Sequence, residues 1–190
     1  MKKIAVFASG NGSNFQAIHD AVESGKLRAE IKLLVCDKPG AFVIERAKKA
    51  GVRVLEFSPK QYASKVEFET MLYEELQKND VDYIVLAGYM RLIGSVLLEH
   101  YPERIINIHP SLLPAFPGVD AIGQAVAAGV KVTGVTIHFV DEGMDTGPII
   151  AQRAIDIQDG ATKDEVAQKV HEIEHEFYPE TLDKLFEGKR

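Results

Sequence analysis

Short runs of consecutive apolar residues alternate along the chain with segments in which apolar residues recur every three or four positions. A continuous apolar run is typical of a strand covered on both faces, and the wider spacing is typical of a helix with one buried side. The runs predict strands over residues 4–8, 31–36, 52–57, 83–87, 105–108, 132–140 and 148–157. The wider spacing predicts helices over residues 15–23, 42–50, 66–78, 94–100, 119–128 and 162–187, the last with an expected kink at Pro179.

Strands and helices in alternation predict an α/β fold, with a mostly parallel central sheet flanked by helices on both faces. The 190 residues contain no internal repeat, low-complexity tract or linker, so we expect one domain over residues 1–190. Hydrophobic residues make up 46% of the chain and charged residues 26%, which excludes disordered and fibrous classes.

The net charge of −6 disfavours nucleic acid and anionic membranes as partners, because both are bound chiefly through Lys and Arg. A small anionic substrate can still bind at a local positive site. The single cysteine, Cys36, lies in an apolar run, which predicts a core residue in a reducing compartment. No apolar stretch approaches the ~20 residues of a membrane span, so we expect a cytoplasmic protein.

A glycine-rich turn, Ser9-Gly10-Asn11-Gly12-Ser13-Asn14, follows the first predicted strand and opens the first helix. Free backbone N–H groups and the helix dipole favour an anion there, and a phosphate is the natural ligand. A tight turn with a helix cap explains the same residues without any ligand. The turn lacks the Lys of a P-loop, and Phe15 occupies the third glycine position of a dinucleotide fingerprint.

Asp37 follows the second predicted strand, where a dinucleotide-binding fold places the acid that binds ribose. This position keeps a nicotinamide-dependent enzyme open as an alternative. An exposed turn over residues 37–40 explains Asp37 equally well.

His171-Glu172-Ile173-Glu174-His175 matches the HExxH pattern of zinc peptidases, in which two helical histidines bind the metal. No third ligand is evident, and short patterns recur by chance. The alternative is a helix whose one face lines a substrate pocket, and we expect no metal.

Asn107 and His109 lie on the same side of the end of the fifth strand, with Ile108 pointing into the core. An amide and an imidazole that converge on one point suit acyl chemistry, because the amide stabilises an oxyanion and the imidazole moves protons. Asp145 lies in an acidic loop after a later strand, and a carboxylate beside His109 would favour the protonated imidazole. A polar strand end and an acidic surface loop are the alternatives. Residues 110–118 carry three prolines and predict a constrained loop beside the pair.

Four segments together resemble the phosphoribosylglycinamide formyltransferases, in order, spacing and total length. They are residues 10–14, Leu86-Ala87-Gly88-Tyr89-Met90-Arg91, Asn107-Ile108-His109-Pro110-Ser111-Leu112-Leu113-Pro114, and His138-Phe139-Val140 with residues 145–148. The resemblance implies a single-domain, Rossmann-like formyltransferase fold that passes a formyl group from 10-formyltetrahydrofolate to the amine of glycinamide ribonucleotide in purine synthesis.

The resemblance also implies the site. It assigns catalysis to Asn107, His109 and Asp145. It assigns the acceptor to Gly12, Ser13, Asn14, Gly88, Pro110, His171 and Glu174. It assigns the folate to Lys65, Met90, Arg91, Leu92, Ile93, Asn107, Val140 and Asp141. The N-terminal half would bind the phosphorylated acceptor, and the C-terminal half would bind the folate and carry the chemistry.

Two positions depart from the family pattern, since Lys65 stands where some members use Arg and His171 where some use Gln. A formyltetrahydrofolate hydrolase would use similar residues but pass the formyl group to water, and it carries an additional N-terminal regulatory domain. A methionyl-tRNA formyltransferase would need a longer chain with a basic extension. We expect small-molecule substrates, no nucleic acid, no membrane and at most a weak homodimer.

Overall fold

The computed structural model describes residues 1–188 and contains one sheet of seven strands. The strands are β1 (Lys2–Ala8), β2 (Ala29–Cys36), β3 (Val54–Glu56), β4 (Tyr83–Leu86), β5 (Ile105–His109), β6 (Val132–Phe139) and β7 (Ile149–Asp156). The helices are α1 (Ser13–Glu23), α2 (Phe42–Lys49), α3 (Lys65–Lys78), α4 (Ser95–His100), α5 (Ala121–Ala128) and α6 (Lys163–Phe186), and Pro59–Gln61 forms a 3₁₀ turn. The predicted α/β class and mostly parallel sheet are confirmed.

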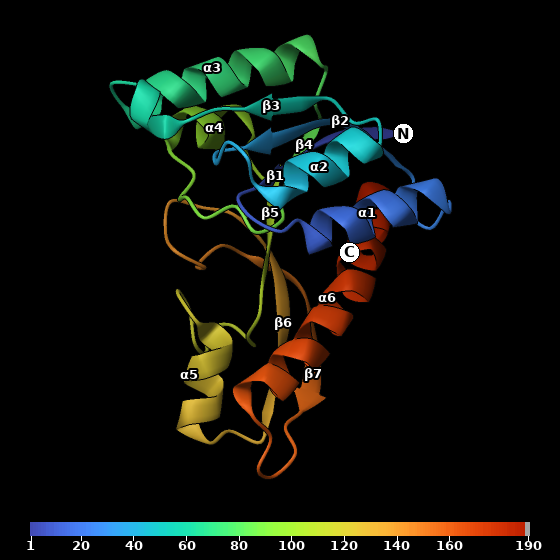
Figure 1. The fold of residues 1–190 in the computed structure, drawn as a ribbon, viewed down its shortest axis with the longest axis vertical. Coiled ribbons are helices and arrows are strands. Elements are labelled where there is room, and N and C mark those ends of the chain that lie inside the picture. The colour runs from blue at the N-terminus through green and yellow to red at the C-terminus, as the bar shows by residue number, and fades with distance from the viewer. Residues whose placement is uncertain (189–190) are drawn as a thin grey trace.

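The strands lie in the order β3-β2-β1-β4-β5-β6-β7 (Figure 1). The first five in this order run parallel, while β6 pairs antiparallel with both β5 and β7. A short loop without a helix joins β6 to β7, and such a connection can link only antiparallel neighbours. The carboxyl ends of β1, β2, β4 and β5 therefore meet at one edge of the sheet, where the loops that follow them lie close together.

The two faces of the sheet carry separate apolar cores. Along β1, Ile4 and Val6 pack in the cluster that α1, α2 and α6 cover, while Ala5 and Phe7 pack in the cluster beneath α3 and α4. This alternation follows from the strand geometry, which sends successive side chains to opposite faces. The lone cysteine, Cys36, is buried, as predicted.

Two helices begin two residues away from their predicted starts, because capping residues set where they begin. Helix α1 begins at Ser13, two residues before the predicted start, because Gly12 turns the chain in the left-handed conformation, with a φ of 81°. Helix α5 begins at Ala121 rather than at residue 119, because the Asp120 side chain accepts a hydrogen bond from the Gly123 N–H.

Helix α6 continues on both sides of Pro179 and runs beside β6 and β7 to reach α1 (Figure 1). Tyr178 fixes its position, since the buried hydroxyl donates to the carbonyl of Leu86 at 2.7 Å and lies 3.2 Å from that of Ile106. Leu86 is the last residue of β4 and Ile106 the second residue of β5, so Tyr178 ties the helix to two neighbouring strands. None of the helices in residues 1–188 combines the length and apolar character needed to cross a bilayer.

Candidate active site

The glycine-rich turn presents uncapped backbone N–H groups at the start of α1. Gly12 is the N-cap residue, and no side chain caps the helix. A Cβ on Gly12 would lie 2.4 Å from Cγ2 of Val43, so this position requires glycine for space as well as for its positive φ. Helix N-termini without a side-chain cap leave their first N–H groups to water or to an anion. The geometry suits the predicted phosphate site at Gly12, Ser13 and Asn14.

Helix α6 brings the predicted acceptor residues of the C-terminal part against this turn. The Asn14 amide nitrogen lies 3.4 Å from Oε2 of the buried Glu174. The same oxygen lies 3.0 Å from Nδ1 of His171, and this hydrogen bond raises the pKa of His171. Residues of both halves of the chain therefore meet at residues 9–14, called the acceptor turn below after the ligand predicted for it.

The second histidine of the HExxH pattern has a different environment. Burial lowers the pKa of His175, and its Nε2 has no hydrogen-bond partner among residues 1–188. In the same residues no three His, Cys, Asp or Glu side chains lie close enough together to hold a metal ion. His171 instead pairs with Glu174, which agrees with the alternative of a helix facing a pocket.

His109 is buried at the end of β5, between two groups that can only accept hydrogen bonds. Its Nε2 lies 2.9 Å from the carbonyl oxygen of Phe116, and its Nδ1 lies 3.4 Å from Oδ2 of Asp145. A carbonyl and a carboxylate only accept hydrogen bonds, so the imidazole of His109 lies between two acceptors, one of them a carboxylate.

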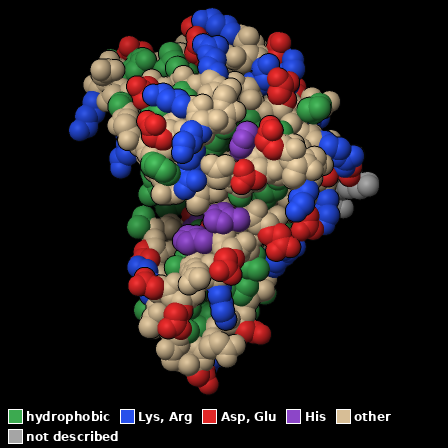
Figure 2. Space-filling model, turned by 45° about the vertical axis from the view of Figure 1, so that its right-hand side comes forward, with side chains coloured by type: hydrophobic (Ala, Val, Ile, Leu, Met, Phe, Trp, Pro, Cys, Tyr) green, Lys and Arg blue, Asp and Glu red, His purple; other side chains and the backbone are tan. Residues whose placement is uncertain are grey.

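A second histidine, His138, lies on the other side of the Asp145 carboxylate, with Nε2 at 3.8 Å from Oδ1. Burial lowers the pKa of His138, which favours its neutral form. Its partner in the β5–β6 register is Asn107. The Asp145 carboxylate therefore lies between two imidazoles, those of His109 and His138. Figure 2 shows histidine side chains on the surface near the middle of the molecule, whereas His109 and His138 themselves are buried.

The loop that follows His109 is held on the sheet. Leu113 donates its N–H to Oγ1 of Thr136 at 3.0 Å, and that hydroxyl donates to the carbonyl of Ser111 at 2.7 Å. At the far end of the loop Gly118 donates its N–H to Oδ2 of Asp145 at 2.9 Å. Pro110, the predicted acceptor contact, is half-buried at the start of this loop. The backbone of this loop therefore contacts His109 through the Phe116 carbonyl and Asp145 through the Gly118 N–H.

The loop after β4 carries the predicted folate residues and is tied to the acceptor turn. Ser9 donates its N–H to the carbonyl of Gly88 at 3.0 Å, and its hydroxyl accepts from the N–H of Met90 at 2.9 Å. The same hydroxyl donates to Asp37, whose other carboxylate oxygen accepts from Nε of Arg91 at 2.8 Å.

The surface-turn interpretation of Asp37 is therefore wrong, since Asp37 is only 6% exposed. Its carboxylate is occupied by Ser9 and Arg91, which leaves no basis in the structure for a ribose contact. The Arg91 side chain likewise points to Asp37 rather than standing free.

Two side chains of α3 hold the other end of this loop. Nζ of Lys65 donates to the carbonyl of Leu92 at 2.9 Å, and the buried Glu69 accepts from the N–H of Gly94 at 2.8 Å. Ile93 is buried between these anchors, whereas Met90 is 75% exposed and Leu92 47%. The loop thus presents apolar side chains on a backbone fixed at both ends.

The remaining predicted folate residues follow β6. Val140 donates its N–H to the carbonyl of Ile105 at 2.9 Å and packs on the α3–α4 core. Oδ1 of Asp141 accepts from the Thr146 hydroxyl at 2.6 Å and from the Gly143 N–H at 3.0 Å, and the Thr146 bond lowers the pKa of Asp141. This closed loop holds Asp145, whose φ is 56°.

Sequence reasoning missed Ser9, Arg46, Glu69 and Tyr178 as residues that shape the site. Only Ser9 could have been identified from the sequence, because it directly follows a predicted strand. The other three fit ordinary helix patterns, and their roles depend on contacts with distant segments.

A hollow of about 1050 Å³ lies between α1 and α6, beside the acceptor turn rather than at His109. Among the predicted site residues only Ser13 lines it. The hollow is therefore adjacent to the glycine-rich turn and separate from His109.

Comparison with known proteins supplies the family. Residues 2–182 match the formyl transferase family. The chain is 56% identical over 185 residues to a phosphoribosylglycinamide formyltransferase of Bacillus subtilis, covering 97% of this chain and 95% of that one. It is 41% identical to the trifunctional purine biosynthetic protein adenosine-3 of Drosophila melanogaster, covering 98% of this chain but 14% of that protein.

Solved structures agree with these relatives. Glycinamide ribonucleotide transformylase 1 of Geobacillus kaustophilus superposes with a TM-score of 0.95 at 58% identity, over 97% of this chain and 98% of that one. A phosphoribosylglycinamide formyltransferase of Streptococcus pneumoniae gives a TM-score of 0.91 at 45% identity, over 98% and 99% of the two chains. The resemblance inferred from the four sequence segments is thereby confirmed, and the chain belongs to the formyl transferase family and, within it, to the phosphoribosylglycinamide formyltransferases.

Proposed function

We propose that the chain transfers the formyl group of 10-formyltetrahydrofolate to the amine of glycinamide ribonucleotide, with Asn107, His109 and Asp145 at the reacting centre. The products are formylglycinamide ribonucleotide and tetrahydrofolate, in purine synthesis. The observation that carries this proposal is the position of buried His109 between the Phe116 carbonyl and the Asp145 carboxylate, at the end of the strand that also carries Asn107.

In the proposed reaction the acceptor amine attacks the formyl carbon, and a C–N bond forms. The former carbonyl oxygen becomes an oxyanion, which the Asn107 amide and the His109 imidazolium stabilise. The oxyanion would accept the hydrogen bond from Nε2 of His109 in place of the Phe116 carbonyl, which lies 2.9 Å from that nitrogen in this structure. The intermediate then collapses, the bond to the folate nitrogen breaks, and a proton passes from the attacking amine to that nitrogen through water held near Asp145.

The acceptor would bind with its phosphate at the N–H groups of Gly12, Ser13 and Asn14 and its ribose at Glu174. The uncapped start of α1 supports the phosphate site. The hydrogen bonds of Glu174 to Asn14 and His171 support the ribose site, because they fix the carboxylate beside the turn. Gly88 and Pro110 would complete the wall between this site and His109.

The folate would lie on the apolar loop from Met90 to Ile93. Exposed Met90 and Leu92 on an anchored backbone suit a flat aromatic ring, since they offer apolar surface without the entropy cost of ordering the loop. Asn107, Val140 and Asp141 would border the ring, and Lys65 and Arg91 would lie at its outer side. The folate is the only cofactor proposed, as a co-substrate. We place the enzyme in the cytoplasm, acting on small molecules without nucleic acid or membrane, with at most weak homodimerisation.

Formyl transfer by the purified chain tests the proposal directly. Tetrahydrofolate release would be followed with and without glycinamide ribonucleotide, with a chelator present, for the wild type, His109→Ala and Asp145→Ala. Acceptor-dependent turnover that both substitutions abolish is the expected result. Release of formate without acceptor would instead identify a hydrolase, and loss of activity with the chelator would reopen the metal hypothesis.

A further inference from the structure

Helix α2 packs directly behind the acceptor turn. Val43 donates its N–H to the carbonyl of Gly10 at 3.0 Å, and its side chain fills the space beside Gly12. Arg46 lies one turn further along α2, so the helix presents both residues to the same short segment. The shape of the turn therefore depends on α2 as well as on α1.

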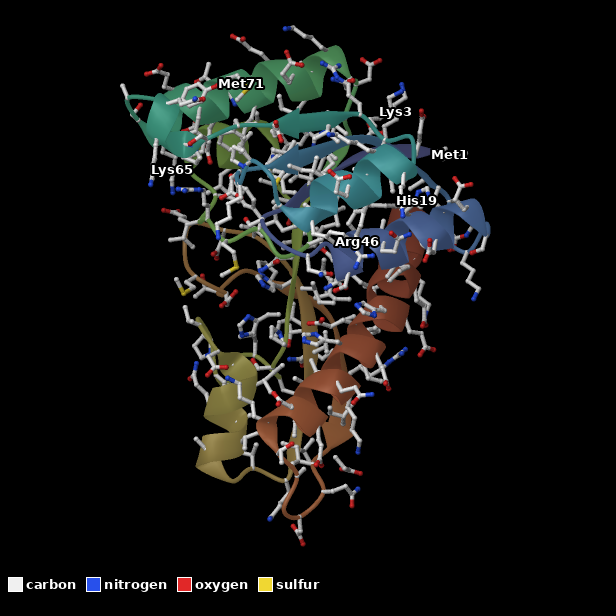
Figure 3. All side chains as sticks on the ribbon, in the orientation of Figure 1. Met1, Lys3, His19, Arg46, Lys65 and Met71 are labelled. Atoms are coloured by element: carbon white, nitrogen blue, oxygen red, sulfur yellow. The ribbon has the colours of Figure 1, made fainter. Side chains whose placement is uncertain are left out.

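Arg46 donates two short hydrogen bonds to the turn. Its Nε donates to the backbone carbonyl of Asn11 at 2.8 Å, and its Nη2 donates to Oδ1 of the same residue at 2.8 Å. Nη1 lies 3.4 Å from Oε1 of Gln16, and the guanidinium carbon lies 4.9 Å from the centre of the Phe42 ring. Figure 3 shows Arg46 beside the start of α1. Two short bonds from one planar group fix both the position and the orientation of Asn11.

Within the part of the chain that the structure describes, Arg46 has no carboxylate partner at a turn suited to an anion. Arg28, Arg53, Arg91 and Arg153 each form a salt bridge with a carboxylate, whereas the hydrogen-bond acceptors of Arg46, like those of Arg104, are all neutral oxygens. Of these two arginines, Arg46 is the one that bonds to the turn. No carboxylate in residues 1–188 lies within salt-bridge distance of its guanidinium. The turn itself, residues 9–14, carries no charged side chain. Arg46 therefore supplies an unneutralised positive charge at a turn suited to an anion, in a chain of net charge −6.

We propose that Arg46 is a positioning residue for the acceptor phosphate, and this inference rests on the proposed function. Arg46 holds Asn11, and with it the N–H groups from Gly12 onward, in the arrangement that receives a phosphate monoester. Its charge also lowers the electrostatic cost of bringing a dianion to the turn. Three of its five N–H donors bond to Asn11 and Gln16, which ties the guanidinium to the turn, so Arg46 acts through the turn.

Arg46→Met and Arg46→Lys separate these two contributions. The Met variant loses both the charge and the two bonds, and we expect the KM for the acceptor to rise roughly tenfold or more, in line with the loss of charge-assisted bonds. The Lys variant keeps the charge without the planar fork, so an intermediate rise is expected. The KM for the folate and kcat should stay within about twofold, because the donor loop is untouched.

Binding of inorganic phosphate provides a readout that does not depend on turnover. Titration calorimetry should show phosphate binding to the wild type, competition with the acceptor, and a weakening in Arg46→Met that parallels the change in KM. Arg53→Met is the matched control, since Arg53 makes two side-chain hydrogen bonds on a distant surface, to Asn79 and Glu75. It should leave phosphate binding unchanged.

Three results would overturn the proposal. The first is unchanged phosphate binding in Arg46→Met, and the second is an equal rise of both KM values, which would indicate general damage to the fold. The third is phosphate binding to the wild type that does not compete with the acceptor. Failure of the wild type to transfer a formyl group would overturn the proposed function instead, while calorimetry with phosphate would still decide the role of Arg46.

Discussion

Asp145 approaches His109 from a loop that belongs to a different part of the chain, and it also receives the N–H of Gly118 from the loop that follows His109. One carboxylate thus holds both the imidazole and the segment that provides its other hydrogen-bond partner. Removing this charge should affect the chemistry more than the binding of either substrate.

Asp145→Asn should lower kcat by roughly 100-fold or more, because a neutral amide no longer favours the His109 cation and the proton route loses its base. The KM values should change much less. Glu142→Gln, an exposed change in the same loop, is the control and should behave as the wild type. Steady-state kinetics for both substrates checks this prediction, and a kcat within a few-fold of the wild type would contradict it.

Gly12→Ala should raise the acceptor KM at least roughly tenfold and destabilise the protein, because the new Cβ would meet the Val43 side chain in a residue with positive φ. Gly25→Ala has the same kind of φ, 77°, but open space around the added atom. It should cost only about 1 kcal/mol and leave the KM unchanged. Chemical denaturation and kinetics of the two variants separate backbone strain from loss of the site.

The ion pair of His171 and Glu174 should make stability depend on pH in a defined direction. The bond raises the folded-state pKa of His171, so its stabilisation is complete below the unfolded pKa of about 6.5 and is lost as pH rises through the folded value. The Tm difference between wild type and His171→Gln should therefore be largest in mild acid and shrink toward alkaline pH.

His175 should change stability with pH in the opposite direction to His171. Burial lowers its pKa, so the unfolded chain takes up a proton first as pH falls, and native His175 destabilises the protein in mild acid. Replacing it with Gln should make the protein relatively more stable at low pH. A parallel pH dependence of the two variants would refute both assignments.

Tyr178→Phe should reduce the free energy of unfolding by about 1–3 kcal/mol, because the buried carbonyls of Leu86 and Ile106 lose their donor while the ring still fills its space. Tyr73→Phe, in a half-buried position on α3, should have a much smaller effect. Urea denaturation of both variants measures the difference. We also expect a rise in the acceptor KM for Tyr178→Phe, since Glu174 lies one turn away on the same helix.

The sequence predicted well those features that local pattern determines. Continuous apolar runs located every strand, and the alternation around Ile108 placed Asn107 and His109 on one side of β5. The burial of Cys36 followed from its place in such a run. The antiparallel pairing of β6 and β7 was not predicted, although the short connection without a helix between the two predicted strands is a signal for it.

Features set by contacts between distant segments were also not predictable. From the sequence, Asp37 is part of an exposed turn, and only the fold shows its bonds to Ser9 and Arg91. Arg46 is likewise an ordinary polar position on α2 in the sequence, and only the fold shows its bonds to the turn. In both cases the side chain is polar in sequence and buried or fixed only in the folded chain.

The bond between Asn14 and Glu174 joins residues that are 160 positions apart. A ribosome releases Asn14 long before Glu174, so a nascent chain carries the acceptor turn but not its ribose contact until α6 has been made and docked. With the acceptor site as proposed, only a chain that includes α6 has both parts of that site, so bound acceptor would stabilise finished chains by mass action.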